Sequence, residues 1–344
     1  MNNIIIYNSK LNLNKSKISN NFYKYDQDIN NLYDCRVINP PFFYNIVILR
    51  EDLNNDDLKK IYNMCLVNGK IYFKSKYKNF FNTNKLFITK KENIIYQFDY
   101  KRIVDFIIIG AQRSGTTSLS INLGKHPEIF INTNKDPKIS EVHFYDLNWK
   151  KGIEWYKKQF NYNYKLVGEK TPSLINLPST FPLIQSVNPY VKLILILRNP
   201  IIRAYSAWKL NKKNYNEKRS FIDAINYELK YKTKSPNTFF SISKKYLQRG
   251  MYYNYIIELY KWFPKNNILI LIMEDLSKFP QQGYYKIFDF LNISQKNNLD
   301  YTVEHKSDDL SEIDKNIYIK LKKFYKNDVK NLEKLLNKKI SWLN

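Results

Sequence analysis

Short apolar runs alternate with amphipathic stretches through the C-terminal two thirds of the chain. The runs at 105–110, 191–197 and 268–273 have the length of a strand and lack polar alternation, as strands buried on both faces do. Apolar residues at helical spacing follow or separate these runs at 116–125, 201–210, 221–231, 246–262, 284–291 and 313–336. Strands that alternate with helices predict an α/β fold with a central parallel sheet flanked by helices.

The first hundred residues follow a weaker pattern. Apolar spacing predicts a helix over 54–68, which Asn68-Gly69 would stop, between strand-like runs. This order bears a weak resemblance to the back half of a Rossmann-type methyltransferase, but no Gly-rich cofactor loop precedes it. We therefore predict an α/β appendage over 1–100, without a methyl-donor site, and a main domain over 101–344. The strands predicted in the appendage are 44–49, 70–74 and 86–90.

Composition excludes several classes of protein. With 344 residues and 44% hydrophobic residues, the chain can bury a sizeable core, which excludes wholesale disorder. Two cysteines exclude a disulfide scaffold and a Cys-based zinc site, and three histidines do not favour a His-rich metal site. No apolar run approaches the roughly 18 residues of a membrane-spanning helix, and the first residues lack the pattern of a signal peptide. These features predict a soluble, cytoplasmic protein.

Charge narrows the class of partner. The chain holds 56 Lys and Arg against 31 Asp and Glu, a formal net charge of +25. Such an excess favours anionic partners: nucleic acid, an acidic polymer or a small molecule that carries phosphate. The frequent Asn, Lys, Ile and Tyr are also typical of an AT-rich genome, so part of the lysine excess is equally explained as solvated surface.

The strongest local feature is the segment GAQRSGTT at 110–117, between a predicted strand and a predicted helix. Its glycine spacing matches a phosphate-binding P-loop, in which backbone N–H groups and a helix N-terminus converge on an anion. Thr116 stands where nucleotide kinases have lysine, and Arg113 supplies a cation earlier in the loop. A phosphoryl-transferring kinase needs that lysine and magnesium, whereas sulfuryl transfer moves less charge and needs no metal. The segment predicts a P-loop-like three-layer fold.

The chain resembles the sulfotransferases that use 3′-phosphoadenosine 5′-phosphosulfate (PAPS), and within them the heparan sulfate amino- and 3-O-sulfotransferases and their bacterial relatives. The resemblance covers roughly residues 103–342 and rests on several spaced motifs in the family's order. These motifs are FIIIGAQRSGTTSL, SEVHFYD, KGIEWY, GEKTPSLI, LILRNPIIRAYSAW, YLQRGMYYNYIIELYKWFPKNNILILIMEDL and NLEKLLNKKISW.

The resemblance implies two groups of donor-binding residues. The first would hold the 5′-phosphosulfate, and its members are Arg113, Ser114, Gly115, Thr116, Thr117 and Ser118. The second, Arg198 and Ser206, would clamp the 3′-phosphate near the carboxyl edge of the sheet, where ligands bind in open α/β folds. The family's disulfide-bearing loop is replaced by VEHKSDDLSEID, from which Lys306 would reach the 3′-phosphate or the adenine.

The resemblance also implies a catalytic group. Glu141 matches the family's catalytic glutamate, the base that removes the acceptor's proton. His143, two residues later on an extended segment, would point to the same side and could share the base role. Lys170 would stabilise charge on the sulfonate or on the bridging oxygen of the leaving phosphate. PAPS is the implied cofactor, with the desulfated nucleotide PAP as its product and no metal required.

The acceptor implied by the resemblance is a hydroxyl or amine of a small molecule or glycan. An acidic acceptor agrees with the net charge, and nucleic acid becomes a minor alternative. Basic residues after the predicted 3′-phosphate helix could bind an acidic glycan, although a solvated basic face explains them equally well. Two other functions stay open: a P-loop nucleotide kinase, and a non-catalytic polyanion-binding protein on the same fold. The basic residues are Lys209, Lys212, Lys213, Lys218 and Arg219.

Overall fold

The computed structural model describes most of the chain from residue 103 onward and short segments before it. The described residues are 53–54, 103–132, 140–188, 190–231, 244–295 and 313–343, together with strands β1 to β6. The chain divides into two compact units. The first comprises residues 1–103, 149–157 and 182–189, and the second comprises the remainder. Because later segments join the first unit, the domain boundary at residue 100 stays a prediction.

Six described strands form a mixed sheet in the first unit, with the order β2-β1-β3-β4-β6-β5. The pairs from β2 to β4 are parallel, and β6 and β5 are added antiparallel. The strands are β1 (Asn3–Ile6), β2 (Phe22–Tyr25), β3 (Phe43–Ile48), β4 (Cys65–Phe73), β5 (Ile88–Thr89) and β6 (Ile95–Gln97). Helix α6 (Ile153–Lys157) also belongs to this unit.

The predicted strands of the appendage coincide with β3, β4 and β5, but the helix over 54–68 is wrong at its C-terminal end. β4 already begins at Cys65, so the last four residues of that helix are strand; residues 55–64 lie outside the described part of the chain. The pairing of β3 with β4 shifts register opposite Asn68-Gly69. This dipeptide therefore makes an irregularity within a strand rather than a helix stop.

The second unit is built around five parallel strands in the order β11-β10-β7-β9-β8, which confirms the predicted central sheet. The strands are β7 (Phe106–Gly110), β8 (Ile129–Phe130), β9 (Leu166–Lys170), β10 (Lys192–Leu197) and β11 (Ile268–Ile272). Sequence periodicity missed β8 and β9. β8 has only two residues, and β9 ends in Glu169 and Lys170, whose charges read as exposed although both side chains are buried.

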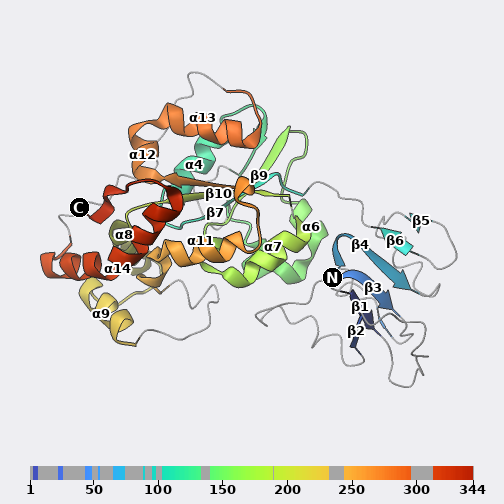
Figure 1. Ribbon diagram of the computed structural model, residues 1–344, viewed down its shortest axis with the longest axis horizontal. Coiled ribbons are helices and arrows are strands. Elements are labelled where there is room, and N and C mark those ends of the chain that lie inside the picture. Colours follow the sequence, from blue (N-terminus) through green and yellow to red (C-terminus); the bar gives the residue numbers. More distant parts are fainter. Residues whose placement is uncertain are drawn as a thin grey trace. The chain divides into compact units, whose positions relative to one another are not determined.

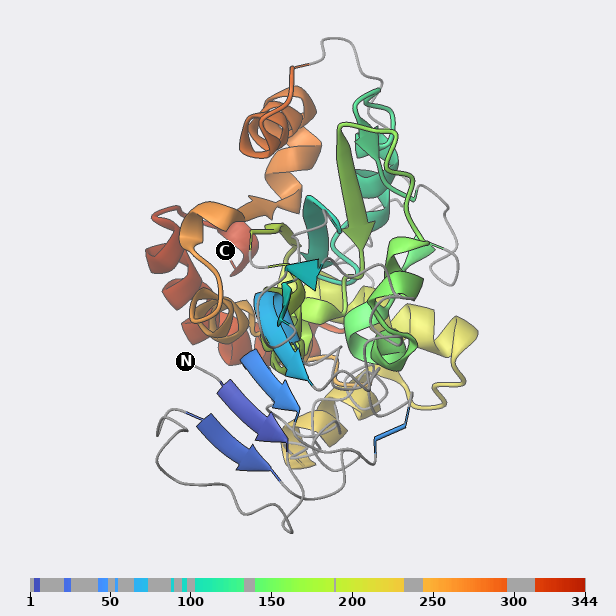
Figure 2. The same cartoon turned by 90° about the vertical axis from the view of Figure 1, so that its right-hand side faces the viewer.

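Helices cover both faces of this sheet. Helices α4, α12 and α13 lie on one side and α8, α11 and α14 on the other (Figure 1). Figure 2 again shows the orange α13 and the red α14 well apart. The helices of the second unit are α4 (Thr116–Leu123), α8 (Pro200–Asn214), α9 (Phe221–Tyr231), α11 (Tyr252–Tyr260), α12 (Met273–Lys278), α13 (Pro280–Leu291) and α14 (Lys315–Leu336), and α7 (Phe181–Val187) begins in it.

Alternate residues of the central strands form the core beneath α4 and α13. Phe106 and Ile108 of β7 and Ile194 and Ile196 of β10 are buried in one cluster with apolar residues of these two helices. The intervening residues of both strands are also buried, so the sheet is covered on both faces. This burial explains why the apolar runs lack polar alternation, and it fixes the strand ends that carry the functional side chains.

One predicted helix starts later than expected. The pattern over 246–262 forms a helix only from Tyr252, because a 3₁₀ turn at Gln248–Gly250 precedes it. A Cβ atom at Gly250 would lie 2.9 Å from both Pro200 Cβ and the Tyr325 hydroxyl. Since only glycine permits this approach, the turn packs directly against α8 and α14.

Candidate active site

Three adjacent strands end at the same edge of the second sheet. In the order β10-β7-β9, β7 leads into the Gly-rich loop, β9 ends at Lys170, and Arg198 directly follows β10. The Thr171 N–H donates to the Ile108 carbonyl at 3.1 Å, which ties the end of β9 to the strand that carries the loop. Parallel strands thus bring the loop and both cations to one edge.

The loop between β7 and α4 has the backbone of an anion cradle. Arg113 and Gly115 adopt left-handed conformations with φ of 71° and 87°. The Ser114 N–H donates to the Ala111 carbonyl at 3.1 Å, and no side chain caps the first turn of α4. The first N–H groups of a helix have no partner within it, so this end can donate to phosphate or sulfate oxygens.

Arg198 and Ser206, which the resemblance assigns to the 3′-phosphate, are linked through Arg113, which it assigns to the 5′-phosphosulfate. Arg113 Nε donates to Ser206 Oγ at 3.0 Å, and Arg198 Nη1 donates to the Arg113 carbonyl at 3.2 Å. Both Arg198 and Ser206 are buried. A buried guanidinium and a hydroxyl at this edge suit an anionic group.

The other loop residues occupy the first turn of the helix and the approach to it. Ser114 and Thr116 are buried, whereas Thr117 and Ser118 are half-buried on α4. Lys306 lies outside the described residues, so its predicted contact with the nucleotide is untested.

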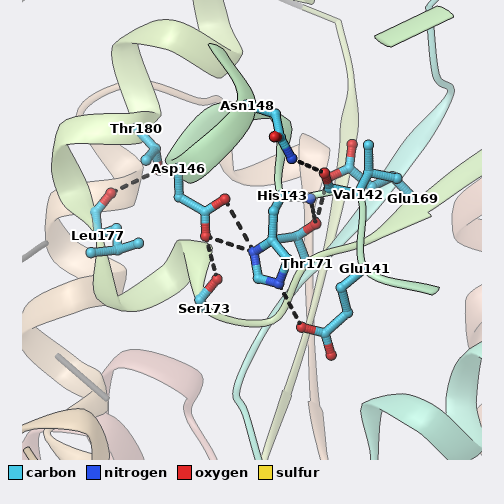
Figure 3. Close-up of polar contacts among 10 residues, drawn as sticks. All are labelled: Glu141, Val142, His143, Asp146, Asn148, Glu169, Thr171, Ser173, Leu177 and Thr180. Carbon is cyan, nitrogen blue, oxygen red and sulfur yellow. Dashed lines mark hydrogen bonds and ion pairs between the residues drawn. The ribbon is translucent and has the colours of Figure 1, made fainter. Parts of the chain in front are cut away.

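Glu141 and His143 lie side by side, but not because the segment between them is extended, as predicted. His143 has a φ of 51°, so the segment is not extended there. Its imidazole nevertheless lies between two carboxylates: Nε2 is 3.3 Å from Glu141 Oε2, and Nδ1 is 2.9 Å from Asp146 Oδ2 (Figure 3). The contact results from the left-handed turn and from Asp146, not from strand geometry.

A second layer of polar groups supports this pair. Ser173 Oγ donates to Asp146 Oδ2 at 2.8 Å, and the His143 N–H donates to Thr171 Oγ1 at 3.3 Å. Thr171 Oγ1 in turn donates to the buried Glu169 at 2.7 Å. Figure 3 shows Thr171 and Ser173, from the segment that follows β9, beside the histidine and Asp146. His143 is therefore held both by contacts to its imidazole ring and by a hydrogen bond from its backbone N–H.

The titration of these groups follows from burial and charge. Burial lowers the pKa of His143, but hydrogen bonds and charges from Asp146 and Glu141 outweigh burial and raise it to about 10. Burial raises the pKa of Glu169 to about 8, against an opposing hydrogen bond from Thr171. At neutral pH the site thus contains an imidazolium between two carboxylates, beside a protonated Glu169.

Lys170 is the most unusual cation of the site. Its side chain is 1% exposed, and Nζ has no hydrogen-bond partner among the residues that the structure describes. Burial lowers the pKa of its ammonium group, and the charge of Glu141 opposes that shift. Burying an ammonium without a hydrogen bond is costly. Such a group is expected where a ligand anion completes its surroundings.

Asp146, Thr171 and Ser173 are candidate functional residues that sequence reasoning missed. Asp146 stands three residues after His143 in the motif already singled out, which was an available signal. Thr171 and Ser173 follow Lys170 directly, but only the folded chain brings them to the histidine. Within the described ranges, no group of three or more His, Cys, Asp or Glu residues could hold a metal ion. No helix in those ranges is both long and apolar enough to cross a membrane.

Comparison with known proteins identifies the family of the chain. The profile of the family described as "Sulfotransferase domain" matches residues 104–341. A sulfotransferase of Alicyclobacillus acidocaldarius has a similar fold, with a TM-score of 0.59 at 23% identity over 70% of this chain and 99% of that one.

Curated relatives match parts of the same region. The membrane-associated sulfotransferase kil1 of Dictyostelium discoideum is 40% identical over 109 residues, 30% of this chain and 22% of that protein. The bifunctional heparan sulfate N-deacetylase/N-sulfotransferase 1 of Caenorhabditis briggsae is 26% identical over 199 residues, 57% of this chain and 23% of that protein. The heparan sulfate glucosamine 3-O-sulfotransferase 5 of Mus musculus is 29% identical over 217 residues, 60% and 58% of the two chains. The matches thus span less than a quarter of the first two relatives.

Proposed function

The chain belongs to the sulfotransferase domain family, and on this premise we propose that it transfers a sulfuryl group from PAPS to a hydroxyl or amine of a carbohydrate acceptor. The observation that carries the proposal is the buried Lys170 ammonium at the end of β9, which pairs with the strand that leads into the Gly-rich loop and the uncapped first turn of α4. Glu141 is close enough to influence the pKa of this ammonium. The carbohydrate class is carried over from the heparan sulfate sulfotransferases among the relatives.

The residues of the loop fit a phosphosulfate group. The first turn of α4 offers N–H donors, and the left-handed backbone at Gly115, which glycine adopts without strain, leads into that turn. Ser114, Thr116, Thr117, Ser118 and Arg113 supply the remaining donors. Arg198 and Ser206, which already meet through Arg113, would hold the 3′-phosphate. Each of these groups is cationic or can donate a hydrogen bond, as an anionic donor requires.

The proposed reaction is an in-line displacement at sulfur. The acceptor oxygen or nitrogen forms a bond to sulfur while the bond from sulfur to the phosphate oxygen breaks, and PAP leaves. Glu141 takes the acceptor's proton, and Lys170 stabilises the negative charge that develops on the departing oxygen. The proton that leaves the acceptor is thus taken up by a carboxylate, and the negative charge on the departing oxygen is stabilised by an ammonium group.

We assign His143 a positioning role, with its predicted share in the base role secondary. A pKa of about 10 keeps the imidazole protonated at neutral pH. A protonated imidazole has no lone pair with which to accept the acceptor's proton, but both of its nitrogens can donate. In that state it holds Glu141 on one side and is held by Asp146 on the other.

The raised pKa of His143 predicts how stability depends on pH. Since the folded-state pKa of about 10 lies above the unfolded value of 6.5, the stabilisation is complete below about pH 6.5 and is lost as pH rises toward 10. Replacing His143 with glutamine removes this term. We expect urea unfolding to show a loss of stability from pH 6.5 to 10 that is larger in the wild type by on the order of a few kcal/mol. Parallel pH curves for the two proteins would contradict the assignment.

Replacing Arg198 with alanine is expected to weaken PAP binding by about 30- to 100-fold. Removing one partner of a buried, charge-assisted contact costs about 2–5 kcal/mol, and part of the clamp survives in Ser206. Isothermal calorimetry with PAP measures the change. Lys326→Ala, which removes an exposed cation from α14, is the control and should bind PAP as the wild type does. Equal PAP affinity in both variants would remove Arg198 from the clamp.

A screen with labelled PAPS and a panel of neutral and acidic sugars tests the function as a whole. Sulfated product on any sugar supports the proposal, and acidic sugars are the expected acceptors of a chain with a net charge of +25. Binding of ATP without binding of PAP would favour the nucleotide kinase instead. Binding of acidic polymers that persists in Glu141→Gln, with no transfer by the wild type, would favour the non-catalytic alternative. Two expectations stay predictions: that the protein is cytoplasmic, and that nucleic acid is not its main partner.

A further inference from the structure

The peptide group that joins Arg198 to Asn199 is held at both of its polar atoms by side chains from distant parts of the chain. The Tyr252 hydroxyl donates to the Arg198 carbonyl at 2.8 Å, and the Asn199 N–H donates to Glu274 Oε1 at 2.9 Å. The Asn199 side chain caps α8 by accepting from the Ile201 N–H at 2.9 Å. The direction in which the Arg198 side chain leaves the strand is therefore fixed by three contacts outside its own strand.

Both holders of this peptide meet at Trp342, near the end of the described chain. The Trp342 indole N–H donates to Glu274 Oε2 at 2.9 Å, and its ring packs edge-on against Tyr252 with centroids 5.8 Å apart. The Trp342 carbonyl accepts from Asn199 Nδ2 at 2.8 Å. One residue thus contacts Tyr252, Glu274 and Asn199 together.

The segment that carries Trp342 is itself anchored. We call residues 338–342 the C-terminal clasp. Lys338 forms an ion pair with Asp275, the Ile340 N–H donates to Glu333 Oε1 at 2.7 Å, and the side chains of Ile340 and Trp342 are buried. The clasp thereby joins the end of α14 to the carboxyl end of β11, the strand beside β10.

The Tyr252 hydroxyl stays protonated at neutral pH, so its hydrogen bond to the Arg198 carbonyl is kept. Burial raises the pKa of the Tyr252 hydroxyl to about 12, so it retains the proton that it donates to the Arg198 carbonyl. Tyr252 and Trp342 are both almost fully buried, so water does not compete for these hydrogen bonds. None of these groups has a role in the proposed proton transfer.

We propose that the C-terminal clasp is a positioning device for the donor nucleotide: Trp342, through Glu274 and Tyr252, holds the Arg198–Asn199 peptide so that Arg198 points at the 3′-phosphate. The inference rests on the proposed function. It predicts that these residues govern affinity for the donor rather than the chemical step, because they act on Arg198 and lie apart from Glu141 and Lys170 in the hydrogen-bond network. A displacement of about 1 Å in a positioning group can cost a hundredfold in rate or affinity.

The experiment compares PAP affinity and steady-state kinetics in matched variants of the full chain. Trp342→Ala should raise the Kd for PAP and the KM for PAPS about tenfold, while kcat at saturating PAPS stays within about twofold. Trp342→Phe keeps the ring against Tyr252 and loses only the indole N–H, so a rise of about two- to threefold is expected. Trp208→Phe is the control: Trp208 lies on α8 beyond Ser206, and its indole N–H donates to the Arg219 carbonyl at 3.1 Å rather than to Glu274. The Kd of this variant for PAP should not change.

Tyr252→Phe provides a second test that leaves the residues of the C-terminal clasp unchanged. It removes only the hydroxyl that holds the Arg198 carbonyl, and it should raise the Kd for PAP with kcat unchanged, even if Trp342→Ala does not fold. If the wild type binds PAP and both Trp342→Phe and Tyr252→Phe bind it equally well, the clasp proposal is wrong while the proposed function stands. A loss of kcat with unchanged KM for PAPS would also overturn it. If the wild type does not bind PAP at all, the proposed function itself fails.

Discussion

Replacing Glu141 with glutamine should lower kcat by about a thousandfold, with PAP affinity within a few-fold of the wild type. The carboxylate is the proposed base, and a positioned general base contributes on the order of 10²- to 10⁴-fold to a rate. Glutamine keeps the shape and can still accept a hydrogen bond from His143, so the pair 3.3 Å apart in the wild type can persist while the proton acceptor is lost. Transfer of labelled sulfate at saturating PAPS and acceptor measures kcat.

The separation of kcat from donor affinity makes this result informative. A general defect in folding would lower the affinity for PAP and the unfolding temperature together with the rate. Asp146→Asn is the matched comparison, because it weakens the hold on His143 without touching Glu141, and it should cost less than Glu141→Gln. Unchanged turnover in Glu141→Gln would remove Glu141 from the base role and return the His143 imidazole as the candidate.

Replacing Lys170 with methionine should lower kcat by roughly 100- to 1000-fold and leave the unfolding temperature unchanged or higher. Removing one preorganised donor to a developing negative charge costs about 10²–10³ in kcat. Without a bound anion, however, the buried ammonium destabilises the folded state. It lacks a hydrogen bond among the described residues, and burial already lowers its pKa. Methionine has a similar length and is apolar, so it fits the same space.

The opposite signs of these two effects distinguish a functional lysine from a structural one. A lysine that held the fold together would lower stability when replaced, and activity would fall because less protein was folded. Thermal unfolding of the free variant and labelled transfer by the same preparation give both quantities. A stable variant with full activity would show that Lys170 does not face the transferred group, and a destabilised one would show that it has a structural role.

The positions of the loop and of Arg198 at one edge of the sheet could be predicted from local features of the sequence, whereas their proposed roles toward the donor come from the resemblance to sulfotransferases. An apolar run followed by a glycine-spaced turn and a helix defines an anion cradle whatever surrounds it. Arg198 directly follows another such run, and parallel strands end at one edge. In the structure both Arg198 and Ser206 contact Arg113, a link that the sequence did not predict.

The neighbours of Lys170 and His143 could not be predicted from local sequence patterns. β9 pairs with β7, although Lys170 lies 62 positions after its partner Ile108 in the chain, and the charged end of β9 gave no sign of burial. The left-handed backbone at His143 replaces the extended segment on which the expectation rested. Asp146 and Ser173 reach the imidazole only because that turn and the segment after β9 fold together.

Hydrophobic periodicity and motif spacing are local properties of a chain, and they were enough to predict the parallel α/β sheet, the glycine-spaced loop and the resemblance to sulfotransferases. Only the folded chain shows that Lys170 is buried without a hydrogen bond among the described residues, that Glu141 and Asp146 flank His143, and that Trp342 reaches the groups that hold the peptide after Arg198. Strand order and burial depend on pairings between residues far apart in the chain. No local pattern encodes such pairings. They bring together the residues to which we assign one proposed reaction.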